Sequence, residues 1–573
     1  MPASQSSLSA LKSATSLSDF AHLIGVKPQW LSYVMYVSST GKSYSVFERP
    51  KKSGGMRTIS APNGQLKNIQ KRTAVLLAKC HADLRREKFD PSRALQHGIV
   101  KSRGSINTNA LKHIGKKFVF NIDLKNFYGS INFGRVRGFF ISDSRFRLRP
   151  EIATLIAQIC CYENSLPQGA PTSPIISEFL GNIIDSRLNR LARKHKCTYS
   201  RYADDITFST NVRVFPRAIA KRKLLSLKRT WAIGRALRRE LKLIKFAVNP
   251  AKTRMQCKRA RQMATGLIVN EKLNVPCEYR KRTRAMCHSL FTTGEAYTIS
   301  STDGVKVPLS LPQVRGRMSF EFSVRSVEYV DSSKGNIRPF RDFKKAKEKA
   351  PEFYRRYRNL LLFEMLHANE MPTILCEGKT DNVYLKCALQ KLAPQYPKMI
   401  SSSGERKVRF FNYSTTTDVL LGLSGGIGGL KNFLETLRDA QNTFEVAPTE
   451  HPLIILVDND AAAKSVWSVV KSILNSHSAV DGSAPHYKIF SNTFVVPIPK
   501  VNPATPIIIE ELFPLSVLNT KLNGKVFNPH NPGGVSSKEY GKWAFAKNVV
   551  VPSYKSIDFL NFKPLLDNID ALL

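Results

Sequence analysis

The chain has 573 residues and carries a formal net charge of +45 at pH 7, with 88 lysines and arginines against 43 aspartates and glutamates. This excludes an acidic or neutral protein and indicates a polyanionic partner, for which nucleic acid is the usual candidate; a basic surface that serves only solubility is the alternative. With 42% hydrophobic residues, the chain is expected to fold into several domains at roughly 150 residues each.

The nine cysteines form no Cys-x-x-Cys pair and no zinc-finger spacing with histidine, so we expect reduced residues of the core. The N-terminus has no basic segment followed by an apolar stretch, and no apolar run approaches the roughly 18 residues that a membrane span requires. These features predict a cytoplasmic protein that does not contact a membrane.

The N-terminal part of the sequence predicts a catalytic layer of strands and helices. A basic, glycine-containing piece, KKSGGMRTISAPNGQLKNIQKR, indicates a strand, a turn and the start of a helix. Strand-like segments then alternate with helical ones in the order KFVFNIDL, SLPQGAPTSP leading into IISEFLGNIIDSRL, and CTYSRYADDITFST. This alternation favours a mixed α/β or α+β layer.

Three aspartates lie at the ends of these predicted strands. Asp123 ends the strand of residues 118–122, while Asp204 and Asp205 occupy the turn between CTYSRY and ITFST. Carboxylates at strand ends can converge, and such a cluster repels itself unless cations lie within it; oxygen ligands select Mg²⁺. Two such ions can activate a 3′-hydroxyl and stabilise a leaving pyrophosphate. Taken alone, an Asp-Asp pair is more often an ordinary β-turn.

Residues 213–262 contain seventeen lysines and arginines and one acid, Glu240, on a helical pattern. A helix that only faces solvent usually interleaves both charges. The one-sided charge therefore favours a surface that binds phosphates.

The composition changes after Met371. PTILCEGKTDNVYLKCAL, FNYSTTTDVLLGLSGGIGGLKNFLETL and PLIILVDNDAAAKSVWSVV each suggest a short buried strand, a loop with acids or glycines, and a helix. This repetition predicts a second domain with a parallel sheet. The glycines of residues 424–429 precede Lys431 and could hold a phosphate on backbone amides or simply form a flexible turn; they lack the spacing of an ATP-binding loop.

Acids follow two of these predicted strands. Glu377 comes after PTILC, and Asp458 and Asp460 come after PLIILV. Because parallel strands end at the same sheet edge, the three carboxylates would form another divalent-metal site there, unless they only cap unrelated loops. Glu510 and Glu511 in IIIEELF add a later acidic pair, or mark an ordinary helix start.

The succession NIDLKNFY, LPQGAPTSP and YADD resembles the palm motifs of reverse transcriptases, over roughly residues 10–320. The element NALKH, Asn109 to His113, and the pair Thr265-Gly266 resemble the retron subgroup, although Ala264 replaces the usual valine before that pair. The resemblance implies a bacterial enzyme with fingers, palm and thumb. It would copy part of its own structured noncoding RNA into DNA from dNTPs, starting at a 2′-hydroxyl of that RNA, and stay bound to the RNA–DNA product (msDNA).

The same resemblance implies individual roles in catalysis. Asp123, Asp204 and Asp205 would hold two Mg²⁺ ions. Lys252 in VNPAKTR would protonate the leaving pyrophosphate, or is only a surface charge. Arg57 would contact the triphosphate, or else an RNA phosphate.

Further roles concern the sugar, the nucleotide pocket and the RNA. Tyr128 would lie under the sugar and exclude a 2′-hydroxyl, or is simple core. Gln168 and Gly169 would line the nucleotide pocket. The segment TGLIVNEKLNVPCEYRKRTRAMCHSL resembles the primer-gripping hairpin and thumb of the family. Its basic residues, which suit a helix laid along a nucleic-acid backbone, are Arg280, Lys281, Arg282 and Arg284.

EGKTDNVYL followed by LVDNDAA resembles the Toprim domain, over roughly residues 371–520, and the nuclease branch fits best. That resemblance implies a Mg²⁺-dependent nuclease, with one or two ions, that acts as an effector in defence against phage; its target is not apparent. The implied metal ligands are Glu377, Asp458 and Asp460, with Glu510 and Glu511 as the later acids. Lys538 and Lys542 are basic residues near the end of the same domain.

We therefore predict an α+β right-hand polymerase followed by an α/β Toprim-like domain. The predicted parts are fingers and palm (1–230), thumb (231–325), a helical connector (326–370), the Toprim-like domain (371–520) and its C-terminal extension (521–573). Two other functions stay open: a reverse transcriptase of a mobile intron, and a nucleic-acid-binding scaffold with an inactive Toprim domain.

Overall fold

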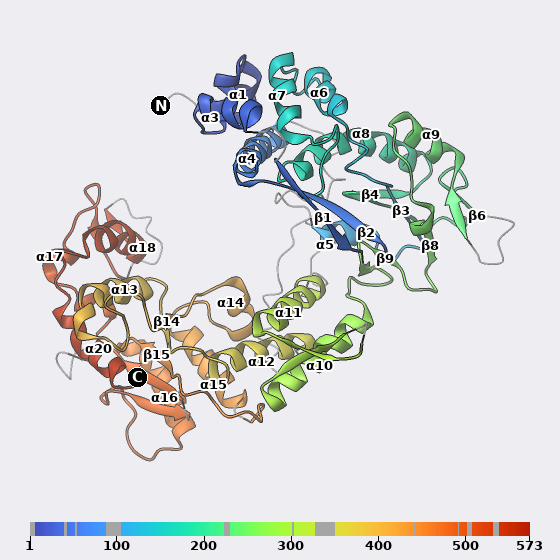
Figure 1. Cartoon of the computed structure of the whole chain (residues 1–573). Coiled ribbons are helices and arrows are strands. Elements are labelled where there is room, and N and C mark those ends of the chain that lie inside the picture. Colours follow the sequence, from blue (N-terminus) through green and yellow to red (C-terminus); the bar gives the residue numbers. More distant parts are fainter. Residues whose placement is uncertain are drawn as a thin grey trace. The chain divides into compact units, whose positions relative to one another are not determined.

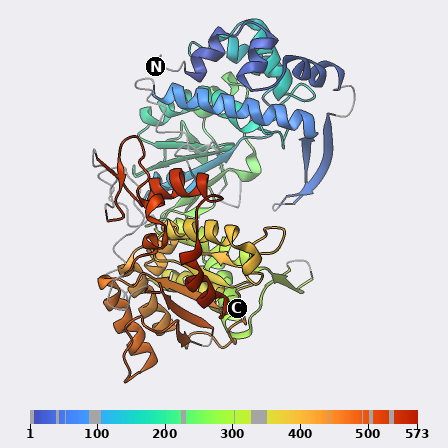
Figure 2. The same ribbon diagram turned by 90° about the vertical axis from the view of Figure 1, so that its left-hand side faces the viewer.

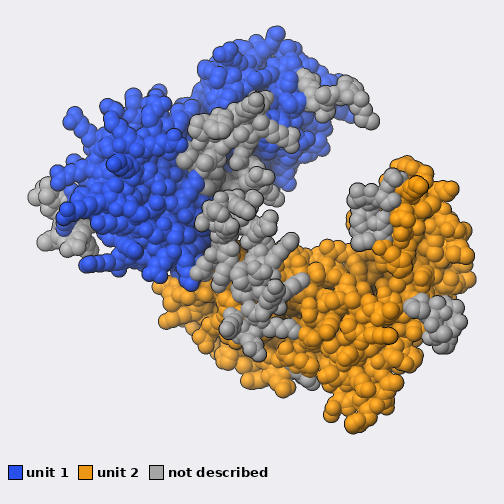
Figure 3. Space-filling view, turned by 180° about the vertical axis from the view of Figure 1, so that it is seen from behind, with its two compact units in different colours: residues 1–276 blue, residues 277–573 orange. Residues whose placement is uncertain are grey.

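The computed structural model describes residues 6–38, 43–51, 54–86, 105–222, 230–300, 303–326, 350–440, 442–490, 492–500, 507–530 and 538–573. The chain forms two compact units, Met1–Pro276 and Cys277–Leu573 (Figure 3). Most of the predicted connector, residues 327–349, lies outside the described residues. The predicted thumb is divided by the unit boundary, since residues 231–276 belong to the first unit and residues 277–325 to the second.

The first unit begins with small helices packed around one long helix. Helix α4 (Gly64–Arg86) contacts α1 (Ser7–Ser13), and the hairpin of β1 (Tyr44–Pro50) and β2 (Met56–Pro62) extends from the start of α4 as a two-stranded arm (Figure 2). The predicted strand, turn and helix start in this region are confirmed. The other helical elements here are α2 (Leu17–Leu23), α3 (Pro28–Ser32) and the π-helical turn Tyr33–Val37.

A four-stranded antiparallel sheet follows, in the order β4-β5-β3-β8 (Figure 1). Its strands are β3 (Phe118–Asp123), β4 (Thr198–Tyr202), β5 (Asp205–Thr210) and β8 (Arg254–Cys257). The sheet shares one hydrophobic core with α6 (Phe133–Ser142), α7 (Pro150–Cys160) and α8 (Ser173–Lys194). Because β8 pairs with β3, the sheet continues beyond residue 230, where we predicted the end of the palm.

Short elements complete the first unit. The basic helix predicted within residues 213–262 is present as α9 (Arg235–Leu243), whose buried side chains are Leu237 and Leu241. The remaining elements are α5 (Ile106–Leu111), β6 (Ala220–Arg222), β7 (Trp231–Ile233), β9 (Met263–Ala264) and β10 (Leu267–Ile268).

The second unit is built on a five-stranded sheet in the order β14-β13-β15-β17-β16. Strands β14 (Arg409–Phe410), β13 (Thr373–Leu375), β15 (Leu453–Val457) and β17 (Thr493–Pro497) run parallel, and β16 (Tyr487–Phe490) is an antiparallel edge. The predicted parallel sheet is therefore present.

Strand alternation explains why this sheet is buried on both faces. Leu453, Ile455 and Val457 enter one core, and Ile454 and Leu456 enter the other. The first core includes α10 (Cys277–Thr293), α11 (Leu311–Arg325), α12 (Glu352–Leu366), α14 (Thr415–Leu421), α15 (Ile427–Ala440) and α16 (Lys464–Leu474). The second includes α13 (Asp381–Lys391), α18 (Lys542–Phe545) and α20 (Lys563–Asp570).

The structure bears on the predictions about the cysteines and about membrane spans. All nine cysteines are free thiols, as predicted, but the predicted position in the core is wrong for Cys257 and Cys277, which are exposed, and Cys161 is half-buried. Within the described ranges, no helix combines the length and the apolar character that crossing a membrane requires.

Candidate active site

The antiparallel pairing of β3 with β5 brings the predicted aspartates together. Asp123 lies directly opposite Asp205 in the register of the two strands. Asp204 occupies the turn between β4 and β5, and its carbonyl accepts a hydrogen bond of 3.0 Å from the Leu124 amide. Side chains from two strand ends and one turn thus share one end of the sheet.

Lysine 252 compensates part of this negative charge. Its Nζ lies 2.8 Å from Asp123 Oδ2, and this hydrogen bond is the main reason that the pKa of Lys252 is raised. The pairing of β3 with β8 and the hydrogen bond from the Asn249 amide to the Asp123 carbonyl, 2.8 Å long, fix the segment that carries Lys252. The structure therefore places Lys252 against the aspartates.

The carboxyl groups show the mutual repulsion expected of a cation site. Crowding by protein atoms, and then the charges of Asp204 and Asp123, raise the pKa of Asp205 to about 6, although part of its surface is exposed. Burial, and then the charge of Asp123, raise the pKa of Asp204. Lys252 opposes both shifts. A bound cation would relieve this repulsion.

Among the described residues, no three acidic, histidine or cysteine side chains are arranged as a ready-made set of metal ligands. The chemistry of the donors nevertheless fits Mg²⁺, because Asp123, Asp204 and Asp205 offer only carboxylate oxygens from adjacent backbone positions. Their roles as metal ligands stay predictions.

A buried ion pair supports the turn that carries Asp204. Arg201, which is 1% exposed, donates two hydrogen bonds of 2.8 Å to Asp185 on α8 and one of 3.1 Å to the Ala203 carbonyl. Ala203 has φ of 53°, a left-handed conformation that is uncommon outside glycine. Tyr199 also donates to Asp185, at 2.7 Å. We infer that Arg201 positions the turn. We did not predict a role for Arg201 or Asp185 from the sequence.

Replacing Arg201 with methionine should therefore lower the free energy of unfolding by about 3–5 kcal/mol, because Asp185 is left as a buried charge without its cation. The double variant Arg201→Met/Asp185→Leu should recover much of this loss. It should still synthesise DNA poorly, because the Ala203 carbonyl has lost its donor. Thermal unfolding and primer extension measure the two effects separately. Full synthesis by the double variant would show that Arg201 serves stability alone.

The predicted nucleotide-pocket residues lie beside the hairpin arm. The Ser60 amide on β2 donates a 2.8 Å hydrogen bond to the Gln168 carbonyl. Gly169 has φ of 121°, and a Cβ there would lie 2.9 Å from the Ser60 carbonyl oxygen, so only glycine fits this position. Arg57, also on β2, is exposed, and its charge opposes the rise in the pKa of Asp204. The arm thus carries a cation toward the carboxylates.

Tyr128 also lies near the carboxylates. Burial, and then the charge of Asp204, raise its pKa, and its ring packs against Phe127 at a centroid distance of 5.5 Å. This position agrees with the predicted contact to the sugar but does not test it.

If Tyr128 lies under the sugar, Tyr128→Ala should admit a 2′-hydroxyl and reduce discrimination against ribonucleotides by about tenfold or more. Tyr128→Phe, which keeps the ring, serves as the matched control. Competition between dNTP and rNTP during primer extension measures the ratio. Unchanged discrimination by the alanine variant would assign Tyr128 to the core.

The NALKH element is structural. His113 is buried, and its two ring nitrogens lie 2.7 Å from the hydroxyls of Ser209 on β5 and Ser200 on β4. Thr265 Oγ1 donates to the Ile106 carbonyl of α5 at 3.3 Å. These contacts tie both retron-like elements to the palm sheet and its neighbouring segments.

The four basic residues predicted to contact nucleic acid lie on α10, in the second unit. Lys281, Arg282 and Arg284 are exposed, while Arg280 is half-buried. Arg284 lies 3.7 Å from Glu352, a contact between two exposed side chains. Three of the four are thus available to a phosphate backbone.

A second group of acids lies where β13 and β15 end. Glu377, Asp381 and Asp458 line one small cavity. Burial, followed by the charge of Asp381, raises the pKa of Glu377 to about 7 and that of Asp458 to about 8. Asp381 begins α13 and accepts a 2.6 Å hydrogen bond from the Gly378 amide. We did not predict Asp381 as a site residue, although it follows Glu377 within the same EGKTD motif.

The later acids have different environments. Glu510 is 1% exposed, and its Oε2 accepts a 2.9 Å hydrogen bond from Lys542. Glu511 is exposed, and its carboxylate accepts a hydrogen bond from the Ile508 amide at 3.3 Å. Within the described residues, Glu377 Oε2 and Glu510 Oε1 are buried without a hydrogen-bond partner. The structure brings Glu510 toward the cluster, and Glu511 only caps its own turn.

Asp460 and the glycine-rich loop flank this group. Asp460 Oδ1 accepts hydrogen bonds of 3.0 and 3.1 Å from the amides of Ala462 and Ala463, so it caps the following turn, and its charge contributes to the raised pKa of Glu377. The Gly426 amide donates to the Glu377 carbonyl at 2.9 Å. That amide is therefore engaged by the backbone rather than free for a phosphate.

Comparison with known proteins finds relatives of the first unit. Residues 49–275 match the family described as reverse transcriptase (RNA-dependent DNA polymerase). The chain is 34% identical over 262 residues to the retron Mx65 reverse transcriptase of Myxococcus xanthus, covering 43% of this chain and 56% of that protein. It is 32% identical to the retron Mx162 enzyme of the same organism, covering 49% and 59%.

A further relative is the retron Ec86 reverse transcriptase of Escherichia coli, which is 29% identical over 54% of this chain and 85% of that protein. The chain thus spans 56% to 59% of the length of the two Myxococcus relatives. These matches support a reverse transcriptase palm in residues 49–275 and a relationship to the retron enzymes.

Proposed function

We propose that this chain, related to the retron reverse transcriptases, is an RNA-directed DNA polymerase that copies part of its own structured RNA into RNA-linked DNA (msDNA). The observation that supports this most is the placement of Asp123 opposite Asp205, with Asp204 in the adjoining turn, inside the segment that matches the family. The family uses Mg²⁺ at this position.

The residues of the site suit nucleotide addition. Mg²⁺, when bound by the three aspartates, would activate the 3′-hydroxyl and stabilise the pyrophosphate. Lys252 pairs with Asp123 and would supply a proton to the leaving group. Arg57 would contact the triphosphate, and the backbone link between Ser60 and Gln168 would hold the arm against the nucleotide pocket.

Purified protein should extend a primer on an RNA template with dNTPs, and chelation of Mg²⁺ should stop the reaction. Magnesium added back in excess should restore synthesis. No synthesis on any RNA template, including RNA that copurifies with the protein, would contradict the proposal.

The second unit favours an additional function. We propose that it is a Toprim-like, Mg²⁺-dependent nuclease that acts as an effector in defence against phage. Four buried or half-buried acids, Glu377, Asp381, Asp458 and Glu510, gather at one edge of a parallel sheet with one compensating lysine, Lys542. Buried carboxylates that crowd together are costly unless they bind a cation or hold protons, so this edge suits one or two Mg²⁺ ions.

Two alternatives predict different bound nucleic acids. A mobile-intron reverse transcriptase would carry intron RNA. A scaffold with an inactive Toprim domain would carry heterogeneous RNA. It would lose no activity when the acids of that domain are replaced by their amides. The copurifying nucleic acid therefore separates all three functions.

A further inference from the structure

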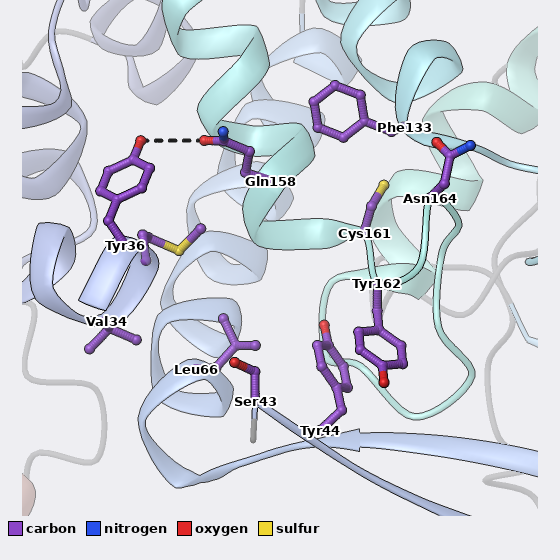
Figure 4. Close-up of a pocket in the computed structure, with 11 residues that line it drawn as sticks. Val34, Tyr36, Ser43, Tyr44, Leu66, Phe133, Gln158, Cys161, Tyr162 and Asn164 are labelled. Atoms are coloured by element: carbon purple, nitrogen blue, oxygen red, sulfur yellow. Dashed lines mark hydrogen bonds between the residues drawn. The ribbon is translucent and has the colours of Figure 1, made fainter. Parts of the chain in front are cut away.

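A cavity of about 640 Å³ lies in the first unit, lined by none of the aspartates of the polymerase site (Figure 4). Its walls come from the turn Tyr33–Val37, the start of β1, α4, the start of α6, and α7 with the turn after it. A volume between roughly 300 and 1,000 Å³ is typical of pockets for small organic groups. The side chains that matter here are Tyr36, Tyr44, Phe133, Gln158, Tyr162 and Asn164.

Two of the tyrosines form a fixed platform. The rings of Tyr44 and Tyr162 stack with centroids 4.2 Å apart. Gln70 on α4 holds this pair in place, because its Nε2 donates hydrogen bonds of 2.8 Å to the Tyr44 hydroxyl and to the Ile159 carbonyl. Because Gln70 already fixes this platform, its side chains lose little conformational entropy when a planar ligand stacks on it.

Tyr36 forms the opposite side of the cavity (Figure 4). Its side chain is 56% exposed, and its hydroxyl donates to Gln158 Oε1 at 3.4 Å. The carboxamides of Gln158 and Asn164 offer donors and acceptors in a lining that is otherwise mainly aromatic and aliphatic.

The uncharged lining of the cavity favours a neutral ligand over a phosphate group. The described residues that line the cavity include no lysine, arginine, histidine, aspartate or glutamate. Burial raises the pKa of Tyr44 and raises that of Cys161 to about 12, so both side chains stay neutral. A phosphate group would call for cations. Aromatic faces with carboxamides instead suit a nucleobase, which presents a π face and a hydrogen-bonding edge.

The cavity is linked to the nucleotide site by one loop. Tyr162 and Asn164 precede Gln168 in this loop, the Leu166 amide donates to the Ile131 carbonyl at 3.0 Å, and Gln168 accepts from Ser60. The cavity and the predicted nucleotide-pocket residues are therefore joined by the same short loop.

We propose that this cavity binds an unpaired nucleobase of single-stranded RNA, turned out of the strand and stacked on the platform of Tyr44 and Tyr162. The choice of RNA rests on the proposed polymerase function. Gln158 and Asn164 would contact the edge of the base.

The test compares full-length wild type with Tyr162→Leu and the matched control Tyr162→Phe, which keeps the ring. Fluorescence anisotropy would measure affinity for a short single-stranded RNA and for the same RNA built with abasic nucleotides. Tyr162→Leu should weaken binding of the base-bearing RNA by about 5- to 150-fold, because one stacked base contributes about 1–3 kcal/mol. Tyr162→Phe should bind like wild type. On the abasic RNA all three proteins should bind alike.

Two outcomes would overturn the base site. In the first, wild type and Tyr162→Leu bind the base-bearing RNA equally. In the second, the leucine variant binds both RNAs equally less well, which would show a structural defect. This assay involves no DNA synthesis, so its result does not depend on polymerase activity. The effect of Tyr162→Leu on binding of the base-bearing RNA should therefore be the same in a protein that also carries Asp205→Asn.

Discussion

Asp205→Asn is expected to abolish DNA synthesis while RNA binding stays close to that of the wild type. The substitution keeps the volume of the side chain but removes a carboxylate that we propose as a Mg²⁺ ligand. Loss of groups that merely support a metal ligand costs about 10- to 100-fold in activity or metal affinity, so removal of the ligand itself should cost more than about a hundredfold. Asp204→Asn should behave in the same way.

Primer extension and RNA affinity, measured on the same preparation, check this expectation. Asp303→Asn is the matched control, because it makes the same chemical change at an exposed aspartate outside both acidic groups. Synthesis near the wild-type rate by Asp204→Asn or Asp205→Asn would refute the assignment of this palm.

Asp458→Asn is expected to abolish cleavage of nucleic acid, and any toxicity or phage protection, while leaving DNA synthesis intact. Glu377→Gln and Asp460→Asn should act alike if they too hold Mg²⁺. Without added metal, Asp458→Asn should also unfold at a higher temperature than wild type, because it removes a carboxylate that is 8% exposed and lies among other acids. The rise in unfolding temperature on adding Mg²⁺ should shrink in this variant.

Glu511→Gln is a sharp control for this experiment, since Glu511 adjoins Glu510 in sequence but is exposed. In cells, the product DNA would be degraded in strains carrying wild type or Asp458→Asn, and growth and nucleic-acid integrity compared. We expect damage only with wild type, because we propose that the bound RNA–DNA product restrains the nuclease. Identical behaviour of both strains would make the second unit a binding module.

The sequence predicted the parts of the fold in which regular strand pairing brings the motifs together. The order of the three polymerase motifs predicted a palm, and antiparallel pairing then brings Asp123 opposite Asp205. Repeated strand, loop and helix units likewise predicted the parallel sheet of the second unit.

What the sequence could not provide depends on packing between distant segments. Arg201 and Asp185 meet only because α8 packs against β4. The two glutamates of IIIEELF are indistinguishable in sequence, yet the short helix of residues 509–512 buries Glu510 and exposes Glu511. The return of β8 to the palm sheet, beyond the predicted boundary at residue 230, could not be predicted for the same reason, since it depends on long-range pairing.

The most direct test of the central claim is to sequence and characterise the nucleic acid that copurifies with the protein. We predict a branched hybrid in which DNA is joined to a 2′-hydroxyl of a structured RNA, and we predict that Asp205→Asn carries the RNA without the DNA. Heterogeneous RNA with no linked DNA, or intron RNA, bound to the wild-type protein would contradict the assignment as a retron-type reverse transcriptase.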